Sequence, residues 1–470
     1  MSIIRQSLCT VIVCYICLTL GLMYAWPSST LKIFSSVNTT LDRPMTETEL
    51  SLLGSLSSIS AMIATPISGF LLDRLGRKYT CILFSLPQVI AWAIVSVVHK
   101  VEAILAAAFI AGFGGCVLLI VPVYVSEFCE ESIRGRLTSG SIIFYGIGTL
   151  VSYLLGGLLE YDMMNYIFLS LSVLATALMT IVADSPIYLM KKGQETNAAK
   201  AIAFYRATKV DSKVVTEEMI TIRRCLNAEM DDDTPEEKKL KVEGKQEEKL
   251  SFWKLMKKSR SSRLALLLGV TLYSSSIFQG LVAVQVYAEP LFSEAVPNMS
   301  ATVSSVLFAV VVVGSGFVAA YFVDVAGRRP LMIYPSLFAG VCCVILGTQI
   351  QFHWGPHWMT AVIIYLYCIA YTFGAGTVPY VIVAEVFLPE VRSIASMLTI
   401  EWAWICNFIV LFIFNPLVTA LGLGGIFYIF AAVCFLSAIY SYFYMPETSG
   451  LTVDVIQGLF AKKSKGKPVV

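Results

Sequence analysis

Long apolar runs constrain this chain more than any other feature of its sequence. A helix needs about 20 apolar residues to cross a hydrocarbon core of about 30 Å, and twelve segments reach that length. Only 14% of the 470 residues are charged, against 57% hydrophobic. We therefore predict an all-α polytopic membrane protein with spans near residues 7–25, 49–71, 79–98, 101–126, 137–159, 164–183, 263–288, 300–323, 331–351, 357–386, 394–417 and 423–444.

Basic residues between these runs predict the orientation of the chain. With a cytoplasmic N-terminus, only Lys32, Arg43 and Lys100 of the 34 Lys and Arg residues fall outside, as the positive-inside rule requires. We expect a plasma-membrane protein with both termini in the cytoplasm. The glycosylation sequons at Asn38 and Asn298 both fall in loops that this assignment places outside.

Several classes of function are disfavoured by the composition. Ten of the twelve cysteines lie in apolar spans and none in a predicted outer loop, so no disulfide framework is expected. The three histidines lack metal-ligand spacing and have no nucleophile motif beside them. We expect no enzyme activity, metal, cofactor or nucleic-acid partner, and a monomer whose surroundings are the lipid bilayer.

A polar stretch divides the twelve spans into six and six. It contains "DDDTPEEKKLKVEGKQEEK", which lacks apolar periodicity, while "NAAKAIAFYRA" and "SFWKLMKK" are expected to form short amphipathic helices at the membrane surface. The expected organisation is a first six-helix bundle at 1–186, a cytoplasmic linker at 187–262, a second bundle at 263–448 and a cytoplasmic tail at 449–470.

Three charged motifs occur once in each half and in the same order. "DRLGRK" at 73–78 returns as "DVAGRR" at 324–329, and "VPVYVSEFCEESIRGRL" returns as "VPYVIVAEVFLPEVRS" with seven residues from Glu to Arg in both. "ADSPIYL" and "MPETSGL" close the two halves. Such a duplicated six-helix unit is typical of secondary transporters.

The charges of these motifs are predicted to hold helix ends together at the cytoplasmic side, since a guanidinium can bind a carboxylate bidentately and a carboxylate is favoured near a helix N-terminus. Glu127 is expected to pair with Arg77 and Arg134, and Glu385 with Arg328 and Arg392. Such pairs would close the inner mouth of a transporter and part when it opens. The full predicted network is Asp73, Arg77, Lys78, Glu127, Arg134, Asp324, Arg328, Arg329, Glu385, Arg392 and Glu447.

With these motifs the sequence resembles the sugar porter branch of the major facilitator superfamily. The similar stretches are "DRLGRK", "VPVYVSE" with "RGRL", "DVAGRRP", "GAGTVPYVIVAEVF" and "MPETSGLTVDVI", in the order of the family across nearly the whole chain. "AWPSSTLKIFS" further resembles insect facilitated trehalose transporters. The resemblance implies two six-helix bundles around a central cavity, alternating access and a sugar substrate.

The predicted sugar site departs from the pattern of that family. The resemblance implies polar and aromatic contacts from helices 5, 7, 8, 10 and 11, and at most of these positions the chain has other residues. They are Ile142, Ser276, Ile277, Val282, Val312 and Tyr380. The helix 11 tryptophan is kept as Trp404, with Asn407 beside it, and the other candidates for substrate contact are Tyr145, Gln279, Gln285, Thr377 and Tyr380.

Glu401 is the acidic residue placed well inside a predicted span, about 13 Å beyond Arg392 at 1.5 Å per residue. An acid at that depth is costly and is usually functional, so Glu401 is a candidate for substrate or proton binding. Proton-coupled members of the resembled family carry an acid in helix 1, and this chain has none there. We therefore expect facilitated diffusion of a hexose or a trehalose-like disaccharide. The alternatives are a proton-coupled sugar or polyol symporter that uses Glu401, and a nutrient sensor that does not transport.

Overall fold

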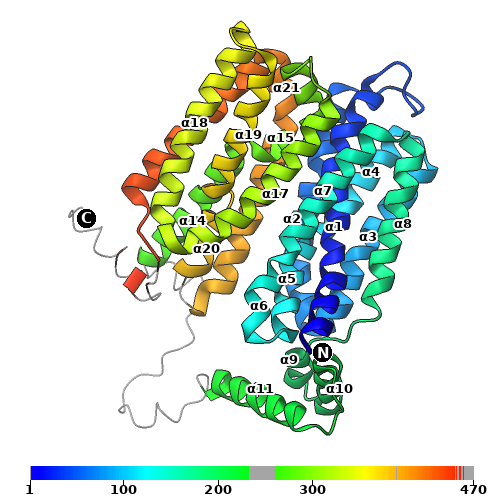
Figure 1. The fold of residues 1–470 in the computed structure, drawn as a ribbon, viewed down its shortest axis with the longest axis vertical. Helices are drawn as coiled ribbons and strands as arrows, with labels where there is room; N and C mark the ends of the chain where they lie inside the picture. The colour runs from blue at the N-terminus through cyan, green and yellow to red at the C-terminus, as the bar shows by residue number, and fades with distance from the viewer. Residues whose placement is uncertain are drawn as a thin grey trace.

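The computed structural model describes residues 2–231, 260–387, 389–449, 451, 455, 456 and 459. The side chains at 131, 135, 136, 225, 227–231, 260, 324, 384 and 389–393 are outside this description, as are the charged tract and "SFWKLMKK". Within the described residues the chain is helical, and two bundles stand side by side (Figure 1).

The first bundle and the helices that follow it are α1 (Ser2–Ser35), α2 (Glu47–Leu75), α3 (Arg77–Val97), α4 (Val101–Gly112), the 3₁₀ turn η1 (Phe113–Cys116), α5 (Val117–Phe128), α6 (Glu131–Thr138), α7 (Gly140–Leu158), α8 (Tyr161–Met179), α9 (Pro186–Lys191), α10 (Glu195–Arg206) and α11 (Lys213–Asp231). The second bundle contains α14 (Arg260–Phe278), α15 (Leu281–Val286), α16 (Ala288–Ala295), α17 (Ala301–Ala326), α18 (Arg328–Phe352), α19 (His357–Phe373), α20 (Val378–Val386) and α21 (Pro389–Tyr444).

Eleven of these helical segments are long and apolar enough to cross a membrane. The last of them covers Ile394–Tyr444, and its backbone leaves the helical conformation at Gly422. That break divides it into two segments of membrane length, so the twelve predicted spans agree with the structure. The predicted boundary between the last two spans, at 417–423, contains this glycine.

The first span is longer than predicted, because α1 continues through Trp26-Pro27 to Ser35, beyond the predicted end at residue 25. Tertiary contacts of the Trp26 indole account for the extension: it is fully buried, donates to Asn165 Oδ1 at 3.2 Å and packs edge-on against Phe34 and Trp92. Packing of this kind outweighs the local signal of a proline.

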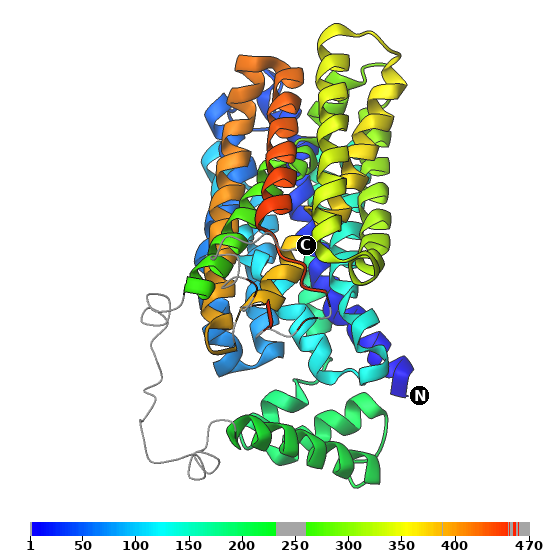
Figure 2. The ribbon, with the colours of Figure 1, turned by 90° about the vertical axis from the view of Figure 1, so that its left-hand side faces the viewer.

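The helices α9, α10 and α11 lie together beyond one end of the first bundle (Figure 2), and we call this the linker end. Arg206 joins them to the bundle, since its guanidinium donates to Phe128 O at 3.1 Å and holds Glu218 with bonds of 2.7 and 2.5 Å. The Tyr205 ring stacks on Phe128 with centroids 4.4 Å apart. The predicted short helix in "NAAKAIAFYRA" is therefore present as α10, packed against α1.

The end of the first bundle that receives the linker is itself held by polar contacts. Glu130 accepts hydrogen bonds from Ser2 Oγ at 2.8 Å and Gln6 Nε2 at 2.9 Å. These two bonds, and the nearby charge of Arg206, lower the pKa of the Glu130 carboxyl. The N-terminus of α1, the end of α5 and the helix α10 thus form one connected unit.

The two bundles meet mainly along two helix pairs, α2 with α21 and α7 with α17, and α1 also contacts α15 and α16. Within the first bundle, α1 and α7 approach closely because glycines face backbone: a Cβ on Gly21 would collide with Tyr145 O, and one on Gly148 with Leu18 O. Small residues at such crossings are typical of membrane helices. Tyr145 on α7 is thereby placed beside the boundary with the second bundle.

Candidate functional site

The first motif forms a compact charge cluster at the linker end. Gly76 separates α2 from α3 with a φ of +88°, a conformation that favours glycine. The Arg77 Nη2 atom lies 2.7 Å from Glu127 Oε1 and its Nη1 donates to Leu72 O at 3.2 Å. Asp184 Oδ1 accepts from the backbone N–H groups of Arg77 and Lys78, each at 3.1 Å.

The second half repeats this cluster contact by contact. Gly327 has a φ of +85°, Arg328 Nη2 lies 2.8 Å from Glu385 Oε1, and Arg328 Nη1 donates to Val323 O at 3.0 Å. Glu447 takes the place of Asp184, because its two carboxylate oxygens accept from the N–H groups of Arg328 and Arg329, each at 3.0 Å. The duplication seen in the sequence is therefore a duplication of geometry.

The long side chains after each arginine also correspond. Lys78 Nζ donates to Thr180 O at 2.8 Å, and Arg329 Nη2 donates to Tyr442 O at 2.7 Å. Each reaches a backbone carbonyl near the end of the last span of its own half. In each half, therefore, the first motif joins three helices: its own, the one carrying the glutamate and the last span.

Two details of the predicted network differ from the structure. Arg134 is exposed on α6 and makes no ion pair with Glu127, whose Oε1 is held by Arg77 and whose buried Oε2 has no partner among the described residues. Asp73 is exposed, and the carboxylate at the start of α3 is that of Asp184, which the sequence analysis did not select. Asp324 and Arg392 have side chains outside the described residues.

At the end opposite the linker, polar contacts join the two bundles. Gln285 Nε2 donates to Tyr145 Oη at 2.8 Å and reaches Thr149 Oγ1 at 3.5 Å, while Tyr153 Oη donates to Gln285 O at 2.5 Å. The N–H of Glu289 donates to Ser28 Oγ at 2.8 Å. Of the candidate residues, Tyr145 and Gln285 are thus brought together across the boundary.

Charge and aromatic packing complete this opposite end. Burial raises the pKa of the Glu289 carboxyl, and the positive charge of Lys32 opposes that rise. The Tyr287 ring stacks on Phe414 with centroids 4.8 Å apart, and its hydroxyl donates to Leu411 O at 2.9 Å. The short helices α15 and α16 are therefore packed between α1, α7 and α21.

In the part of α21 that precedes the break at Gly422, Glu401, Trp404 and Asn407 follow each other at intervals of three residues, which places them on one face of the helix. Trp404 Nε1 donates to Thr65 Oγ1 of α2 at 3.2 Å. Glu401 Oε1 and Asn407 Oδ1 are buried and have no hydrogen-bond partner among the described residues. Polar atoms in that condition are available to a ligand.

The remaining candidates fall into different surroundings. Gln279 is fully buried, and neither its Oε1 nor its Nε2 has a partner in the described part of the chain. Thr377 Oγ1 already donates to Thr372 O at 2.7 Å. Tyr380 is exposed, with its ring edge-on to Tyr273 at 5.2 Å. Gln279 is thus the candidate with the largest unmet hydrogen-bonding capacity.

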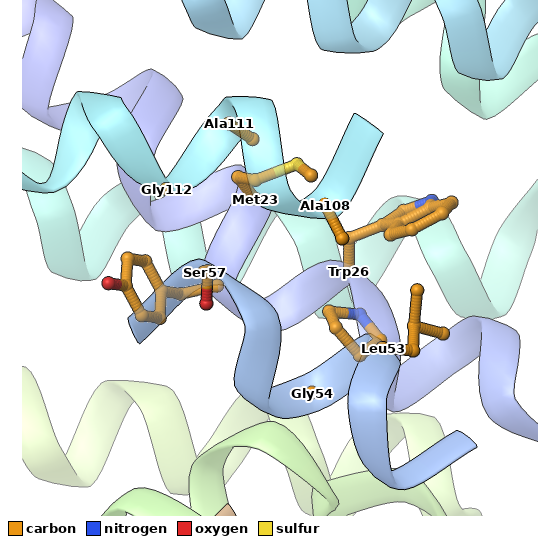
Figure 3. Close-up of a pocket in the computed structure, with 10 residues that line it drawn as sticks. Met23, Trp26, Leu53, Gly54, Ser57, Ala108, Ala111 and Gly112 are labelled. Carbon is orange, nitrogen blue, oxygen red and sulfur yellow. The ribbon is translucent and has the colours of Figure 1, made fainter. Parts of the chain in front are cut away.

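Two residues beside this central region were missed by the sequence analysis. Tyr24 and Ser57 line a cavity of about 10 Å³ between α1, α2 and α4 (Figure 3). The Tyr24 ring lies 6.3 Å from that of Tyr145, and its buried hydroxyl has no partner in the described structure. A cavity of this size holds about one water molecule, so the first bundle is nearly closed here. The sequence signal that could have identified Tyr24 is a hydroxyl-bearing side chain within an apolar run.

The described residues contain no group of three or more His, Cys, Asp or Glu side chains placed to hold a metal. The eleven cysteines that the structure describes as free are all buried. Asn38 and Asn298, the two sequon residues, are both exposed at the end opposite the linker.

Comparison with known proteins places these features in a family context. The family model described as "Sugar (and other) transporter" matches residues 6–460. A facilitated trehalose transporter of Drosophila yakuba is 25% identical over 451 residues, covering 94% of this chain and 50% of that protein. One from Polypedilum vanderplanki is 24% identical over 463 residues, covering 97% of this chain and 88% of that protein. The chain therefore spans about half the length of several of these relatives.

Solved structures show the same fold. The inward open conformation of the xylose transporter from E. coli superposes with a TM-score of 0.75 at 20% identity, covering 96% of this chain and 98% of that one. The proton:xylose symporter bound to 6-bromo-6-deoxy-D-glucose gives a TM-score of 0.68 over the same shares.

Proposed function

The chain belongs to the sugar transporter family, and from this membership we propose that it carries a sugar across a membrane by alternating access. The observation that carries the proposal is the repeated charge cluster. Each cluster ties three helices of its own half together at the linker end, so each half can move as a unit. Three of the candidate residues with buried polar atoms that lack partners belong to the second half: Glu401 and Asn407 on α21, and Gln279 in the turn between α14 and α15.

The state of the structure fits one stage of such a cycle. The hydrogen bonds between the halves that the described residues make lie near the middle or at the end opposite the linker, through Gln285, Tyr153, Glu289 and Trp404. The arginine pairs at the linker end join helices within one half. We infer an inward-facing transporter whose outer gate is formed by α15 and α16.

This state changes the role proposed for the charge clusters. If the pairs parted whenever the inner mouth opened, they would be broken in an inward-facing structure, yet both are formed here. We propose instead that they stiffen the linker end of each half through the whole cycle. The whole network, which includes Lys78, Arg329 and Glu447, then makes the helices of each half move together. It does not open or close the path of the substrate.

The proposed location and substrate follow from the same reasoning. The linker end is cytoplasmic because the basic residues gather there, and the expected location is the plasma membrane with both termini inside. Several relatives are facilitated trehalose transporters, so a hexose or trehalose-like disaccharide is the proposed cargo. We propose facilitated diffusion, since helix 1 of this chain carries no acid within its apolar run.

A second candidate is proton-coupled transport through Glu401. Its Oε1 is buried without a partner among the described residues. A carboxyl in that position is stabilised by carrying a proton. Closure of the inner mouth over it would then require proton uptake.

Uptake into proteoliposomes tests both candidates. Labelled glucose, fructose, trehalose and a polyol panel are supplied with and without an imposed proton gradient. Facilitated diffusion predicts equilibration that the gradient does not change. Accumulation driven by the gradient and abolished by Glu401→Gln would establish the second candidate, and absence of flux for every compound would favour a nutrient sensor.

A further inference from the structure

A groove opens at the end opposite the linker, above the contacts that close the path. It has a volume of about 240 Å³ and lies between helices of both halves, with Lys32 from α1, Glu47 from α2, Glu294 from α16 and Asn415 from α21 around it. The stacked rings of Tyr287 and Phe414 also line it. Since Tyr287 belongs to the segment that closes the path, the groove borders the closed outer gate directly.

The charged side chains of the groove make no ion pairs in the described part of the chain. Lys32, Glu47 and Glu294 are exposed, and none has an ion-pair partner within 4 Å in the described part of the chain. Arg43, close by in sequence, shows the contrast, because it pairs with Glu49 at 2.7 Å and Glu102 at 3.1 Å. Some charged side chains at this end therefore form ion pairs that stabilise the fold, whereas those of the groove can bind a ligand.

The chemistry of the lining selects a class of ligand. One ammonium and two carboxylates give a net charge of −1, which disfavours anions, and together with an amide they offer both donors and acceptors. Aromatic rings beside such groups suit the apolar face of a sugar ring. Drug-sized ligands occupy roughly 300–1,000 Å³, so a groove of about 240 Å³ suits one ring better than two.

We propose that this groove is an outer waiting site, which binds a single neutral sugar ring while the outer gate is closed. The inference rests on the proposed sugar transport and adds a second site to it. A disaccharide would place one ring in the groove and leave the other in solvent. Because both halves line the groove, opening of the gate changes its shape and releases the sugar toward the centre.

The test requires a transporter whose outer gate cannot open. A Cβ built on Gly157 of α7 lies 2.6 Å from Thr302 Cβ of α17, about 1 Å closer than the 3.5–4.5 Å of a disulfide. Once α7 and α17 separate by about that 1 Å, the disulfide of Gly157→Cys/Thr302→Cys locks the halves at the α7–α17 contact, away from the groove. Reduction should restore uptake, which shows that the locked protein is folded. Ser28→Cys/Glu289→Cys provides a second lock.

In the locked protein, Val418→Cys places a thiol in the groove, and a membrane-impermeant maleimide measures its accessibility. D-glucose at ten times its dissociation constant should slow labelling about tenfold. Val37→Cys, at a residue that is 91% exposed and outside the groove, should label at an unchanged rate. Glu294→Gln combined with Asn415→Ala should abolish the protection of Val418→Cys.

Three results would overturn the waiting site: no protection by glucose in either locked protein, equal protection of Val37→Cys, or protection by glucose 6-phosphate as strong as that by glucose. These results are independent of the transport assay. Loss of uptake in the reduced, unlocked protein would count against sugar transport, whereas loss of protection alone counts against the groove.

Discussion

At the scale of single residues, the centre of the molecule is marked by polar atoms that the protein does not satisfy. Asn407 Oδ1 and Glu401 Oε1 are buried without partners, whereas the Trp404 indole between them bonds to Thr65. An unsatisfied buried acceptor costs about 1–3 kcal/mol. Such a cost is tolerated at a site where a ligand supplies the missing hydrogen bond.

We predict that Asn407→Ala raises the KM for sugar about 2- to 12-fold, the equivalent of one hydrogen bond of 0.5–1.5 kcal/mol. The thermal stability of the purified protein should not fall, because Oδ1 has no protein partner to lose. Thr377→Val is the matched control: its hydroxyl is already bonded to Thr372 O, so KM should stay unchanged. Equal effects of the two substitutions would contradict the assignment.

The arginines of the charge clusters give a second prediction. Arg77→Ala leaves the Glu127 carboxylate, 12% exposed, without its partner, and should lower the free energy of unfolding by about 3 kcal/mol. Arg328→Ala should act similarly, and both should slow uptake. The measurements are thermal unfolding in detergent and initial uptake rates.

Arg134→Ala serves as the comparison for both substitutions. Its side chain is exposed and makes no ion pair with Glu127, so the change in stability should stay within about 0.5 kcal/mol. If Arg134→Ala were as harmful as Arg77→Ala, the pairing observed here would not be the important one.

Residue-level prediction from the sequence succeeded where a pattern occurred twice. The repeat of "DRLGRK" pointed to Arg77 and Arg328, which the structure pairs with Glu127 and Glu385. The seven-residue interval after Glu127 did not lead to an ion pair, because Arg134 is exposed and does not reach that carboxylate. Asp184 was missed because an aspartate before Ser-Pro looks like an ordinary helix cap. The residues that contact the sugar stay predictions. The positions of their side chains depend on how the two halves pack, and no local sequence pattern encodes that packing.

At the scale of elements, the linker helices are attached to the first half by a buried arginine together with the stacking of Tyr205 on Phe128. Arg206, 9% exposed, bonds to Phe128 O and Glu218. Arg206→Ala should therefore speed amide hydrogen exchange in α9, α10 and α11 by roughly 10- to 100-fold, equivalent to about 1.4–2.8 kcal/mol. Mass spectrometry of the exchanged protein measures this.

Arg223 offers the control for that prediction. It pairs with Glu195 between the same helices, at 2.5 Å, but both side chains are more than half exposed. Surface pairs contribute about 0–1 kcal/mol, so Arg223→Ala should change exchange only slightly. Similar acceleration of exchange by both substitutions would show that an exposed ion pair stabilises these helices as much as the buried Arg206 does, which would contradict the prediction.

Element boundaries were predicted unevenly, and the reason is physical. Spans that end at charges, such as α3 beginning at Arg77, follow directly from the cost of placing charge in lipid. The end of α1 could not be predicted, because its continuation through Pro27 depends on contacts of Trp26 with α3 and α8. The break in α21 was predicted correctly, because it occurs at Gly422, within the predicted boundary at 417–423.

At the scale of the whole molecule, the fold was predictable because lipid permits few alternatives. Backbone polar groups must be satisfied internally in the membrane, so the lengths of the apolar runs and the twofold repeat of a six-helix unit nearly determine the architecture. The conformational state was not predictable. The conformational state depends on which end of the boundary between the halves is closed. The same sequence adopts both the inward-facing and the outward-facing state, so it cannot indicate which one is observed.

Orientation is the property of the whole molecule that is most simply tested. Asn38 and Asn298 are exposed at the end opposite the linker, and we predict that both carry glycans when the protein is made in a eukaryotic cell. Asn38→Gln and Asn298→Gln should each increase electrophoretic mobility, and glycosidase treatment should remove the differences. Glycans on neither residue, with both sites accessible only from the cytoplasm, would reverse the proposed orientation.

The two charge clusters have a consequence for how the protein can be made. Among the described residues, the contacts of each cluster come from its own half: Asp184 caps α3, and Glu447 caps α18. Polypeptides ending at residue 231 and beginning at residue 260 should each fold without borrowing a contact for these clusters. Co-expressed as a split transporter, they should reassemble and restore uptake, while Asp184→Asn in one fragment should reduce the yield of that fragment alone.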